Sequence, residues 1–282
     1  MKEVIVITGA TNGIGKAAAL DLAKDFQHII FTYRDEDLKN GLCLEINEIN
    51  SDILLDSVYC DFSSFDSIRD ACDRIKNLTQ KIDVLINNAG VVNTSYLETD
   101  AGIENTFAVN HLGYFLFTNL LVGLVPHNSG KIINVASAAH AFVKDMQWDD
   151  LNYKKEFNMG FKAYGQSKLA NILFTKHLSK KLLTKGIAVN CIHPGGVNTA
   201  LGDQNQSLLG KILKILLKPF FRTPLKGAQS ILYLARMSDN SVSGEYFVDS
   251  KIKGTSMAAR NESSQERLWE LSEEMVKQTF SL

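Results

Sequence analysis

The sequence predicts an α/β fold, with one domain built on a doubly wound parallel sheet of about seven strands and helices on both faces. Short apolar segments alternate with longer segments of helical periodicity along the whole chain. The apolar segments lack interleaved polar residues, so both faces of the sheet must be covered, and crossover helices between parallel strands provide that cover. The 282 residues fit the size range of one such domain.

Four predicted strands in the first half of the chain are each followed by a predicted helix. The strands are expected at residues 4–8, 28–33, 54–60 and 82–87. The helices are expected at residues 14–25, 38–50, after Ser63-Ser64, and 102–125. Both serines are candidate N-caps, because a serine hydroxyl accepts a hydrogen bond from the first helical turn. The apolar run 113–125 is too short to span a membrane, so this helix is expected to be buried.

The second half of the chain continues the alternation. Strands are expected at residues 132–135, 187–192 and 245–248, and helices at 161–185, about 224–237, and 262–277. Sheets of this kind bind ligands beyond the carboxyl ends of their strands, where the strand order reverses. Functional residues are therefore expected directly after the strands.

Charge balance and cysteine spacing exclude several classes of protein. The 30 Lys+Arg residues are matched by 31 Asp+Glu, so the chain lacks the strong net basic charge that argues for a nucleic-acid binder. The cysteines form no C-x-x-C pair, which predicts neither disulfides nor zinc and suits a cytoplasmic protein. His111, His140 and His193 lack metal-ligand spacing and are expected to be structural or to line a pocket, so no metal is predicted. The apolar run 4–7 is too short for a targeting signal.

A glycine-rich turn, TGATNGIG at residues 8–15, joins the first predicted strand to the first helix. Gly9 permits a tight turn, Gly13 lets the backbone approach a pyrophosphate, and Gly15 allows close helix–strand packing. The helix N-terminus offers free N–H groups to the phosphates. This predicts a Rossmann-type dinucleotide site, and the alternative is a plain glycine turn. The residues expected at the cofactor are Gly9, Thr11, Asn12, Gly13, Ile14 and Gly15.

The end of the second strand bears on the choice of cofactor. A site that prefers NAD commonly places a carboxylate there for the ribose 2′-hydroxyl, whereas this sequence has Tyr33 followed by Arg34. An arginine can bind a 2′-phosphate through two hydrogen bonds and stack on adenine. NADP(H) is therefore favoured over NAD(H). The alternative is a solvated Arg34 beside Asp35 and Glu36.

Tyr164 and Lys168 are the candidates for proton transfer. They stand four residues apart on a predicted helix and share one face of it. Free tyrosine has a pKa of about 10, and a nearby ammonium favours the phenolate, so Lys168 is expected to lower the pKa of Tyr164 toward neutrality. Tyr164 could then act as a general acid or base. Taken alone, the pair could equally be surface neighbours.

The motifs occur in a characteristic order along the chain. They are the glycine-rich turn, Asn87-Asn88-Ala89-Gly90, Ser137, Tyr164-x-x-x-Lys168 and Pro194-Gly195. In this combination the sequence resembles the short-chain dehydrogenase/reductase family over essentially its whole length. The segments AYGQSKLAN at 163–171 and LWELS at 268–272 look most like the retinol dehydrogenase branch of that family.

The resemblance implies roles for four catalytic residues. Tyr164 would exchange a proton with the substrate oxygen, and Lys168 would hold the nicotinamide ribose and lower the pKa of Tyr164. Ser137 would orient the carbonyl, and Asn110 would hold the water of a proton relay that reaches Lys168. The residue-level alternatives are that Ser137 caps a turn and that Asn110 is a satisfied buried amide.

The resemblance also implies cofactor contacts. Asn88, Ala89 and Gly90 would line the ribose on the adenosine side, and Asp61 and Phe62 would meet the adenine. The residues expected near the nicotinamide are Tyr164, Lys168, Pro194, Gly195, Val197 and Thr199. Asp61 has an alternative role as the N-cap of the following helix, and the two roles are compatible.

Two departures from the family pattern stand out. The fifth strand ends in Ala136-Ser137 where the family often has Ser-Ser, but the second position matches the catalytic serine. The N-terminal membrane anchor of many animal retinol dehydrogenases has no counterpart here, which weakens an inference that retinoids are the substrate. The helices at 102–125 and 161–185 match the family's usual dimer surface, so a homodimer is a candidate assembly.

Residues 207–222 form a basic amphipathic pattern, with Lys211, Lys214 and Lys218 on one side and apolar residues near the other. Three interpretations remain open: a substrate lid at about 200–225, a lid that also contacts an anionic membrane surface, or a helix packed on the body. All three supply an apolar pocket wall.

The sequence as a whole predicts an NADP(H)-dependent oxidoreductase that interconverts a carbonyl and an alcohol. The expected substrate is apolar, such as a retinoid or a long-chain aldehyde. One alternative is an NAD-linked alcohol dehydrogenase. The other is a catalytically silent protein that senses the cofactor, against which the complete set of Asn110, Ser137, Tyr164 and Lys168 argues.

Overall fold

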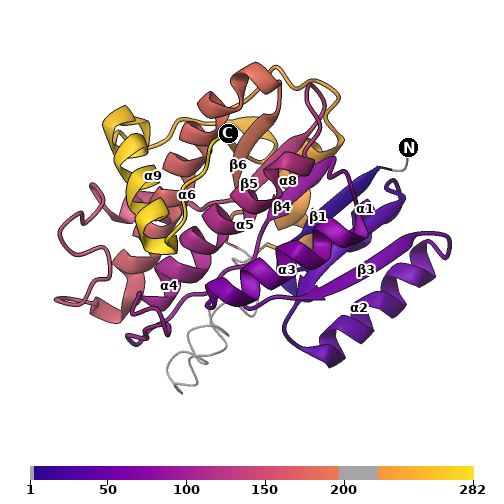
Figure 1. Cartoon of the computed structure of the whole chain (residues 1–282), viewed down its shortest axis with the longest axis horizontal. Helices are drawn as coiled ribbons and strands as arrows, with labels where there is room; N and C mark the ends of the chain where they lie inside the picture. Colours follow the sequence, from indigo (N-terminus) through magenta and orange to yellow (C-terminus); the bar gives the residue numbers. More distant parts are fainter. Residues whose placement is uncertain (1–2, 197–221) are drawn as a thin grey trace.

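The computed structural model describes residues 3–196 and 222–282. In this part of the chain a single sheet has the strand order β3-β2-β1-β4-β5-β6-β7-β8 (Figure 1). The strands are β1 Val4–Ile7, β2 His28–Tyr33, β3 Leu54–Tyr59, β4 Val84–Asn87, β5 Lys131–Val135, β6 Ala188–His193, β7 Tyr246–Val248 and β8 Lys251–Ile252. The strand order reverses between β1 and β4, so the predicted doubly wound sheet is confirmed.

The helices follow the strands as the periodicity predicts. They are α1 Gly13–Leu22, α2 Glu36–Ile49, α3 Phe65–Leu78, α4 Asn105–Phe107, α5 Gly113–Leu121, α6 Phe161–Lys181, α8 Pro224–Arg236 and α9 Glu262–Val276. Shorter helical turns are η1 Ala108–Leu112, η2 Val122–Leu124, η3 Ala138–Phe142, η4 Asn158–Gly160, η5 Leu183–Lys185 and η7 Ala258–Arg260. Ser64 is the N-cap of α3, because its hydroxyl accepts a hydrogen bond from the Ser67 amide at 3.3 Å.

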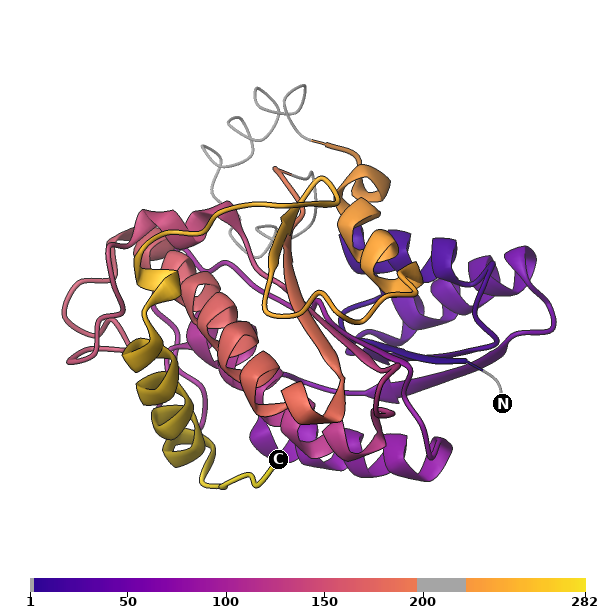
Figure 2. The same cartoon turned by 90° about the horizontal axis from the view of Figure 1, so that it is seen from above.

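Two layers of helices enclose the sheet (Figure 2). On one face, α1, α2 and α8 cover a buried cluster that includes Ile5, Phe31 and Ile231. On the other face, α3, α5 and α6 cover a larger cluster that includes Leu85 and Phe117. The central strands are buried on both faces, which explains why their sequences are continuously apolar. The functional residues that follow them are therefore placed at the open edge of a rigid sheet.

Two predictions about the elements need correction. An eighth strand, β8, pairs antiparallel with β7. It is only two residues long and exposed, so it leaves no periodic signal in the sequence. The helix predicted at 102–125 is not continuous, because η1 is a turn of π-helix in which the Gly113 amide donates to the Ala108 carbonyl. Residues Asn105–Leu124 are apolar enough to cross a membrane, but 83% of that stretch is buried in the fold, as expected for a core helix.

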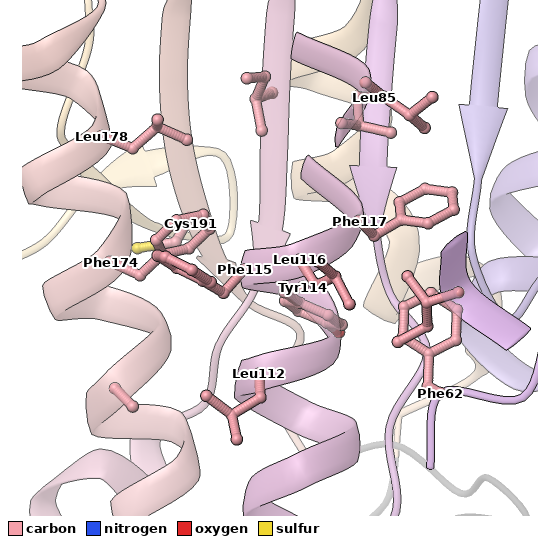
Figure 3. Close-up of a cluster of buried hydrophobic side chains, with 14 of the residues drawn as sticks. Phe62, Leu85, Leu112, Tyr114, Phe115, Leu116, Phe117, Phe174, Leu178 and Cys191 are labelled. Carbon is pink, nitrogen blue, oxygen red and sulfur yellow. The ribbon is translucent and has the colours of Figure 1, made fainter. Parts of the chain in front are cut away.

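Helix α9 packs against the outer side of α6 and near η1 (Figures 1 and 2). Trp269 of α9 lies edge-on to Phe115, with ring centroids 4.9 Å apart, and stacks on Phe174 at 6.1 Å. Figure 3 shows Phe115 on α5 beside Phe174 on α6 within the buried cluster. Trp269 belongs to the same cluster. The surface of α5 and α6 that we expected to serve a homodimer is therefore covered in part by the chain's own C-terminal helix.

Some predictions fall on residues outside the described part of the chain. They concern Val197 and Thr199 as cofactor contacts, and most of the segment 200–225 that includes the amphipathic stretch 207–222. The chain leaves the described region after Gly196 and returns at Arg222, whose amide donates to the Gly196 carbonyl at 2.7 Å.

Candidate active site

The glycine-rich turn after β1 is packed so closely that two of its positions admit only glycine. Gly9 has a φ of +64°, and a Cβ there would lie 2.8 Å from the Cα of Ala89. A Cβ on Gly15 would lie 2.3 Å from the Gly9 carbonyl oxygen and 2.4 Å from Nδ2 of Asn88. The turn and the loop after β4 therefore form one close-packed unit, which leaves the backbone exposed on its outer side.

Thr8 and Asn88 join the two loops by hydrogen bonds. The Thr8 hydroxyl accepts from the amides of Asn88 and Ala89, at 2.8 and 3.0 Å. The Asn88 side chain donates in return to the carbonyls of Thr8 and Gly9, each at 3.0 Å. Thr8 was not among the predicted site residues, since its partners are about 80 positions away in the sequence. The one signal in the sequence that points to Thr8 is its position at the end of a predicted buried strand.

The N-terminus of α1 lies directly after this turn. Asn12 is the N-cap, and its side chain accepts from the Gly13 amide at 2.7 Å. The next amides of the first turn have no partner within the helix, so they can donate to an anion. Thr11, Asn12, Gly13 and Ile14 are all partly or fully accessible here. This cradle suits a pyrophosphate, as the glycine pattern predicted.

Arg34 and Asp61 meet where β2 and β3 end. Nη1 of Arg34 lies 4.0 Å from Oδ1 of Asp61, and the arginine side chain is 53% exposed. Oδ1 of Asp61 also accepts from the amide and hydroxyl of Ser63, at 2.9 and 2.8 Å. Asp61 thus stabilises the turn before α3. The N-cap of α3 is Ser64, so the alternative prediction that Asp61 is the N-cap is wrong. The Arg34 guanidinium remains accessible at the edge where the cofactor's adenosine is expected.

Phe62 points away from that edge. Its side chain is 4% exposed, and its ring lies 5.5 Å from that of Phe117 in the core (Figure 3). A Cβ on Gly113 would come within 2.5 Å of the Phe62 ring, so α5 packs directly on it. The Phe62 side chain therefore belongs to the core. Only the backbone of Phe62 could make the predicted adenine contact.

Tyr164 and Ser137 are brought together by α6 and the end of β5. The Ser137 side chain lies near enough to the Tyr164 hydroxyl to lower the pKa of the tyrosine, against the effect of burial. Ser137 also begins η3, where its hydroxyl accepts from the Ala139 amide at 3.1 Å. A serine hydroxyl has one donor and two acceptor positions, so it can cap this turn and contact a substrate oxygen as well. Capping therefore orients the Ser137 hydroxyl and leaves its proton free to donate to a substrate oxygen.

Lys168 is almost completely buried below this pair, with 3% of its surface exposed. Its Nζ donates to the Val135 carbonyl at 3.0 Å and lies 5.7 Å from the Tyr164 ring centroid. A Cβ on Gly90 would lie 3.2 Å from Oδ1 of Asn110 and 3.8 Å from Nζ, so the glycine backbone packs close to both side chains. Burial lowers the pKa of Lys168 to about 7. Tyr114, whose ring lies 5.8 Å from Nζ, is a further neighbour that the sequence did not identify.

The pKa of Tyr164 shifts in the direction opposite to the one we expected. Burial, which disfavours the charged phenolate, raises it to about 12, against the lowering effect of the neighbouring Ser137 side chain. Lys168 does not counter this effect, because its Nζ donates to the Val135 carbonyl and lies 5.7 Å from the Tyr164 ring centroid. The chain's own groups therefore keep Tyr164 as a neutral phenol, which is the form required of a proton donor.

Asn110 lies within η1, with its side chain fully buried and satisfied. Its amide group exchanges two hydrogen bonds with the Val91 backbone, at 2.8 and 2.9 Å, and donates to the Ser167 hydroxyl at 3.0 Å. The side chain thus links the loop after Gly90 to α6, next to Tyr164 and Lys168. The alternative of a satisfied buried amide describes this side chain, so a role in water binding would fall to another part of the residue.

The loop after β6 completes the edge of the site. Pro194 and Gly195 follow the strand, and Gly195 has a φ of +82°. A Cβ on Gly195 would come within 2.7 Å of the Arg222 side chain, which forms a two-point ion pair with Asp249. The ends of β1 to β6 thus bring the described loop residues of the predicted set to one edge of the sheet, where η1 and α6 add Asn110, Tyr164 and Lys168.

Comparisons with known proteins give a consistent result. A family model described as enoyl-(acyl carrier protein) reductase matches residues 9–250. Mouse retinol dehydrogenase 14 is 38% identical over 97% of this chain and 86% of its own length. Human retinol dehydrogenase 13 is 36% identical over 97% of this chain and 84% of its own length.

Solved structures share the fold. An uncharacterised protein from Mycobacterium paratuberculosis aligns with a TM-score of 0.76 and 27% identity, covering 99% of this chain and 95% of that one. A blue fluorescent protein from a metagenomic library, solved in complex with NADPH, aligns with a TM-score of 0.68 and 25% identity, covering 87% of this chain and 95% of that one.

Proposed function

Because this chain belongs to the short-chain dehydrogenase/reductase family and is an oxidoreductase of that family, we propose that it interconverts an apolar carbonyl compound and its alcohol with NADP(H). The observation that carries this proposal is the meeting of Tyr164, Ser137 and Lys168 at the edge where the strands end. These three groups can orient a carbonyl oxygen, protonate it and resupply the proton.

The residues present fit a nicotinamide dinucleotide. The cradle of Gly9 and Gly15 and the free amides of α1 suit its pyrophosphate, and the loop at Gly90 lies next to the Lys168 amine. When bound, the cofactor supplies the hydride that passes to or from the substrate carbon. The contacts proposed for Asn88, Ala89, Pro194, Val197 and Thr199 belong to the same proposal.

The chain's own residues would then perform the proton chemistry. Ser137 and Tyr164 would both donate to the substrate oxygen, because the Ser137 side chain lies next to the Tyr164 hydroxyl. Tyr164 gives up its proton in the direction of reduction. Lys168, whose pKa is about 7, is poised to replace that proton at neutral pH.

The accessible Arg34 supports the choice of NADP(H), since its guanidinium can bind a 2′-phosphate where an NAD site would place a carboxylate. An NAD-linked alcohol dehydrogenase is the second candidate. The names of the relatives and the amphipathic sequence 207–222 favour an apolar substrate such as a retinoid or a long-chain aldehyde. We further propose a cytoplasmic location, with peripheral membrane contact through 207–222 and a homodimer as additional features.

An activity screen tests this proposal. The protein is incubated with NADPH, or with NADH, and with straight-chain aldehydes of increasing length, all-trans-retinal and small polar ketones. We expect NADPH oxidation that rises with chain length and is absent from Tyr164→Phe. Faster turnover of small polar carbonyls would refute the apolar pocket, and a preference for NADH would refute the role of Arg34. Tight NADPH binding without turnover of any compound would favour the silent sensor.

A further inference from the structure

Two histidines, His140 and His193, hold the same peptide group from opposite ends. That peptide joins Ser137 to Ala138, directly after the proposed catalytic serine. Nδ1 of His140 lies 2.7 Å from the Ser137 carbonyl oxygen, and the Ala138 amide donates to Nδ1 of His193 at 3.2 Å. The peptide's acceptor and donor are therefore each satisfied by an imidazole ring.

The hydrogen bonds fix the tautomer of each ring. A carbonyl oxygen only accepts, so Nδ1 of His140 carries the proton, and its Nε2 accepts from the Ser256 amide at 3.2 Å. Backbone amides only donate, so Nδ1 of His193 is unprotonated, and it also accepts from the Gly195 amide at 3.3 Å. Both rings are therefore neutral, and they adopt opposite tautomers.

The surroundings of the rings keep them neutral. Burial lowers the pKa of His193 and the charge of Arg222 lowers it further, whereas Asp249 opposes them. Burial likewise lowers the pKa of His140, against the hydrogen bond to Ser137, and the Tyr246 ring lies edge-on to it with centroids 5.4 Å apart. Protonation of either ring would remove an acceptor that a backbone amide uses.

We propose that His140 and His193 are positioning residues for Ser137, acting as a clamp on the peptide that follows it. This inference rests on the proposed function, since the orientation of Ser137 matters only if its hydroxyl binds the substrate oxygen. The other bonds to Ser137 come from within the same turn, since its hydroxyl accepts from the Ala139 amide at 3.1 Å and its carbonyl accepts from the His140 amide at 3.2 Å. His193 also accepts from the Gly195 amide, so it connects the turn at Ser137 with the loop after β6.

The two tautomers can be measured without any substrate. The chain has six histidines, and long-range ¹H–¹⁵N spectra at pH 7.5 report which ring nitrogen of each carries the proton. Signals are assigned with the variants His140→Asn and His193→Asn. We expect the proton on Nδ1 of His140 and on Nε2 of His193. A proton on Nδ1 of His193, or its absence from Nδ1 of His140, would overturn the clamp.

A matched pair of variants tests the consequence for catalysis. The amide of asparagine superimposes on Nδ1 of histidine, whereas that of glutamine superimposes on Nε2. His193→Asn should keep kcat within about 3-fold, and His193→Gln should lower it roughly 10–100-fold, because small displacements of orienting groups have effects of this size. The Kd for NADPH should stay within about 2-fold in His193→Asn, which keeps the acceptor for the Gly195 amide. In a Ser137→Ala background, His193→Gln should cost less than about 3-fold more, because its effect passes through Ser137.

Hydrogen exchange gives a readout that does not need activity. The Ala138 amide should exchange about tenfold faster in His193→Gln than in His193→Asn or the unaltered protein. Equal losses in the two variants, or a full additional loss in the Ser137→Ala background, would overturn the clamp. If the unaltered protein reduces no carbonyl, the proposed function fails, and the tautomers and the Ala138 exchange rate still decide whether the clamp exists.

Discussion

The Nζ of Lys168 donates a hydrogen bond to the carbonyl oxygen of Val135, at 3.0 Å. Val135 is the last residue of β5, and Ser137 follows two positions later, so the strand that presents the serine also holds the lysine. Nδ2 of Asn171 donates to the same carbonyl at 3.3 Å. The carbonyl therefore keeps a partner when Lys168 turns toward another acceptor.

The burial of Lys168 should be visible in the pH dependence of stability. The unfolded chain keeps this proton up to about pH 10.5, whereas the folded protein releases it near pH 7. Between these values the unfolded state binds more protons, so the free energy of unfolding rises with pH. We expect Lys168→Met to be the more stable protein at pH 7. Its advantage should shrink by roughly 2 kcal/mol between pH 7 and 9 in urea unfolding. Parallel pH profiles would contradict the buried, perturbed amine.

The close packing of the glycine-rich turn predicts the effect of one methyl group. Gly15→Ala would place a Cβ 2.3 Å from the Gly9 carbonyl, so the turn must shift. We expect a loss of about 1–3 kcal/mol in the free energy of unfolding and at least tenfold weaker NADPH binding. Gly41→Ala, in the middle of α2 with no atom within 4 Å of the new Cβ, is the matched control. It should be neutral or stabilising by up to about 1 kcal/mol, and similar behaviour of the two variants would argue against the cradle.

Arg34 should determine the choice between the two nicotinamide cofactors. Removing its guanidinium leaves the ribose hydroxyl contacts in place but removes the group that can bind a 2′-phosphate. We expect Arg34→Ala to weaken NADPH binding about 10- to 100-fold, since a charge-assisted pair contributes about 1.5–3 kcal/mol. NADH binding should change less than about 3-fold in the same fluorescence titration. Equal weakening of both would mean that Arg34 acts on the fold of the adenosine edge.

Helix α9 should contribute strongly to stability through Trp269. This side chain is 5% exposed and contacts rings on α5 and α6, so its truncation leaves a large cavity. We expect Trp269→Ala to cost about 3–5 kcal/mol in the free energy of unfolding. Met257→Ala is the control, because Met257 is 87% exposed and its loss should stay within about 0.5 kcal/mol. A Trp269→Ala variant as stable as this control would show that α9 is only loosely attached.

Local patterns account for what the sequence predicted correctly. The alternation of apolar segments and helices is a short-range signal, and it sufficed to place β1, β4, β5 and β6. Residues such as Gly9, Asn88 and Ser137 directly follow those strands, so parallel topology brings them to one edge.

Long-range contacts account for what the sequence did not predict. The π turn around Asn110 depends on the Val91 backbone, and the inward direction of Phe62 depends on α5 packing on it. The docking of α9 depends on rings from three helices. The sign of the shift in the pKa of Tyr164 depends on how deeply the fold buries its side chain. Sequence periodicity identifies none of these partners, because it reports only on residues that are close together in the chain.

The most direct test of the central claim is the kcat of Tyr164→Phe for carbonyl reduction, measured beside its Kd for NADPH. The variant lacks only the phenolic hydroxyl, so the Kd should stay within about 3-fold. General acid catalysis contributes about 10²–10⁴-fold, so kcat should fall at least about 100-fold. A variant that binds NADPH and keeps more than about a tenth of the unaltered protein's kcat would show that Tyr164 is not the proton donor.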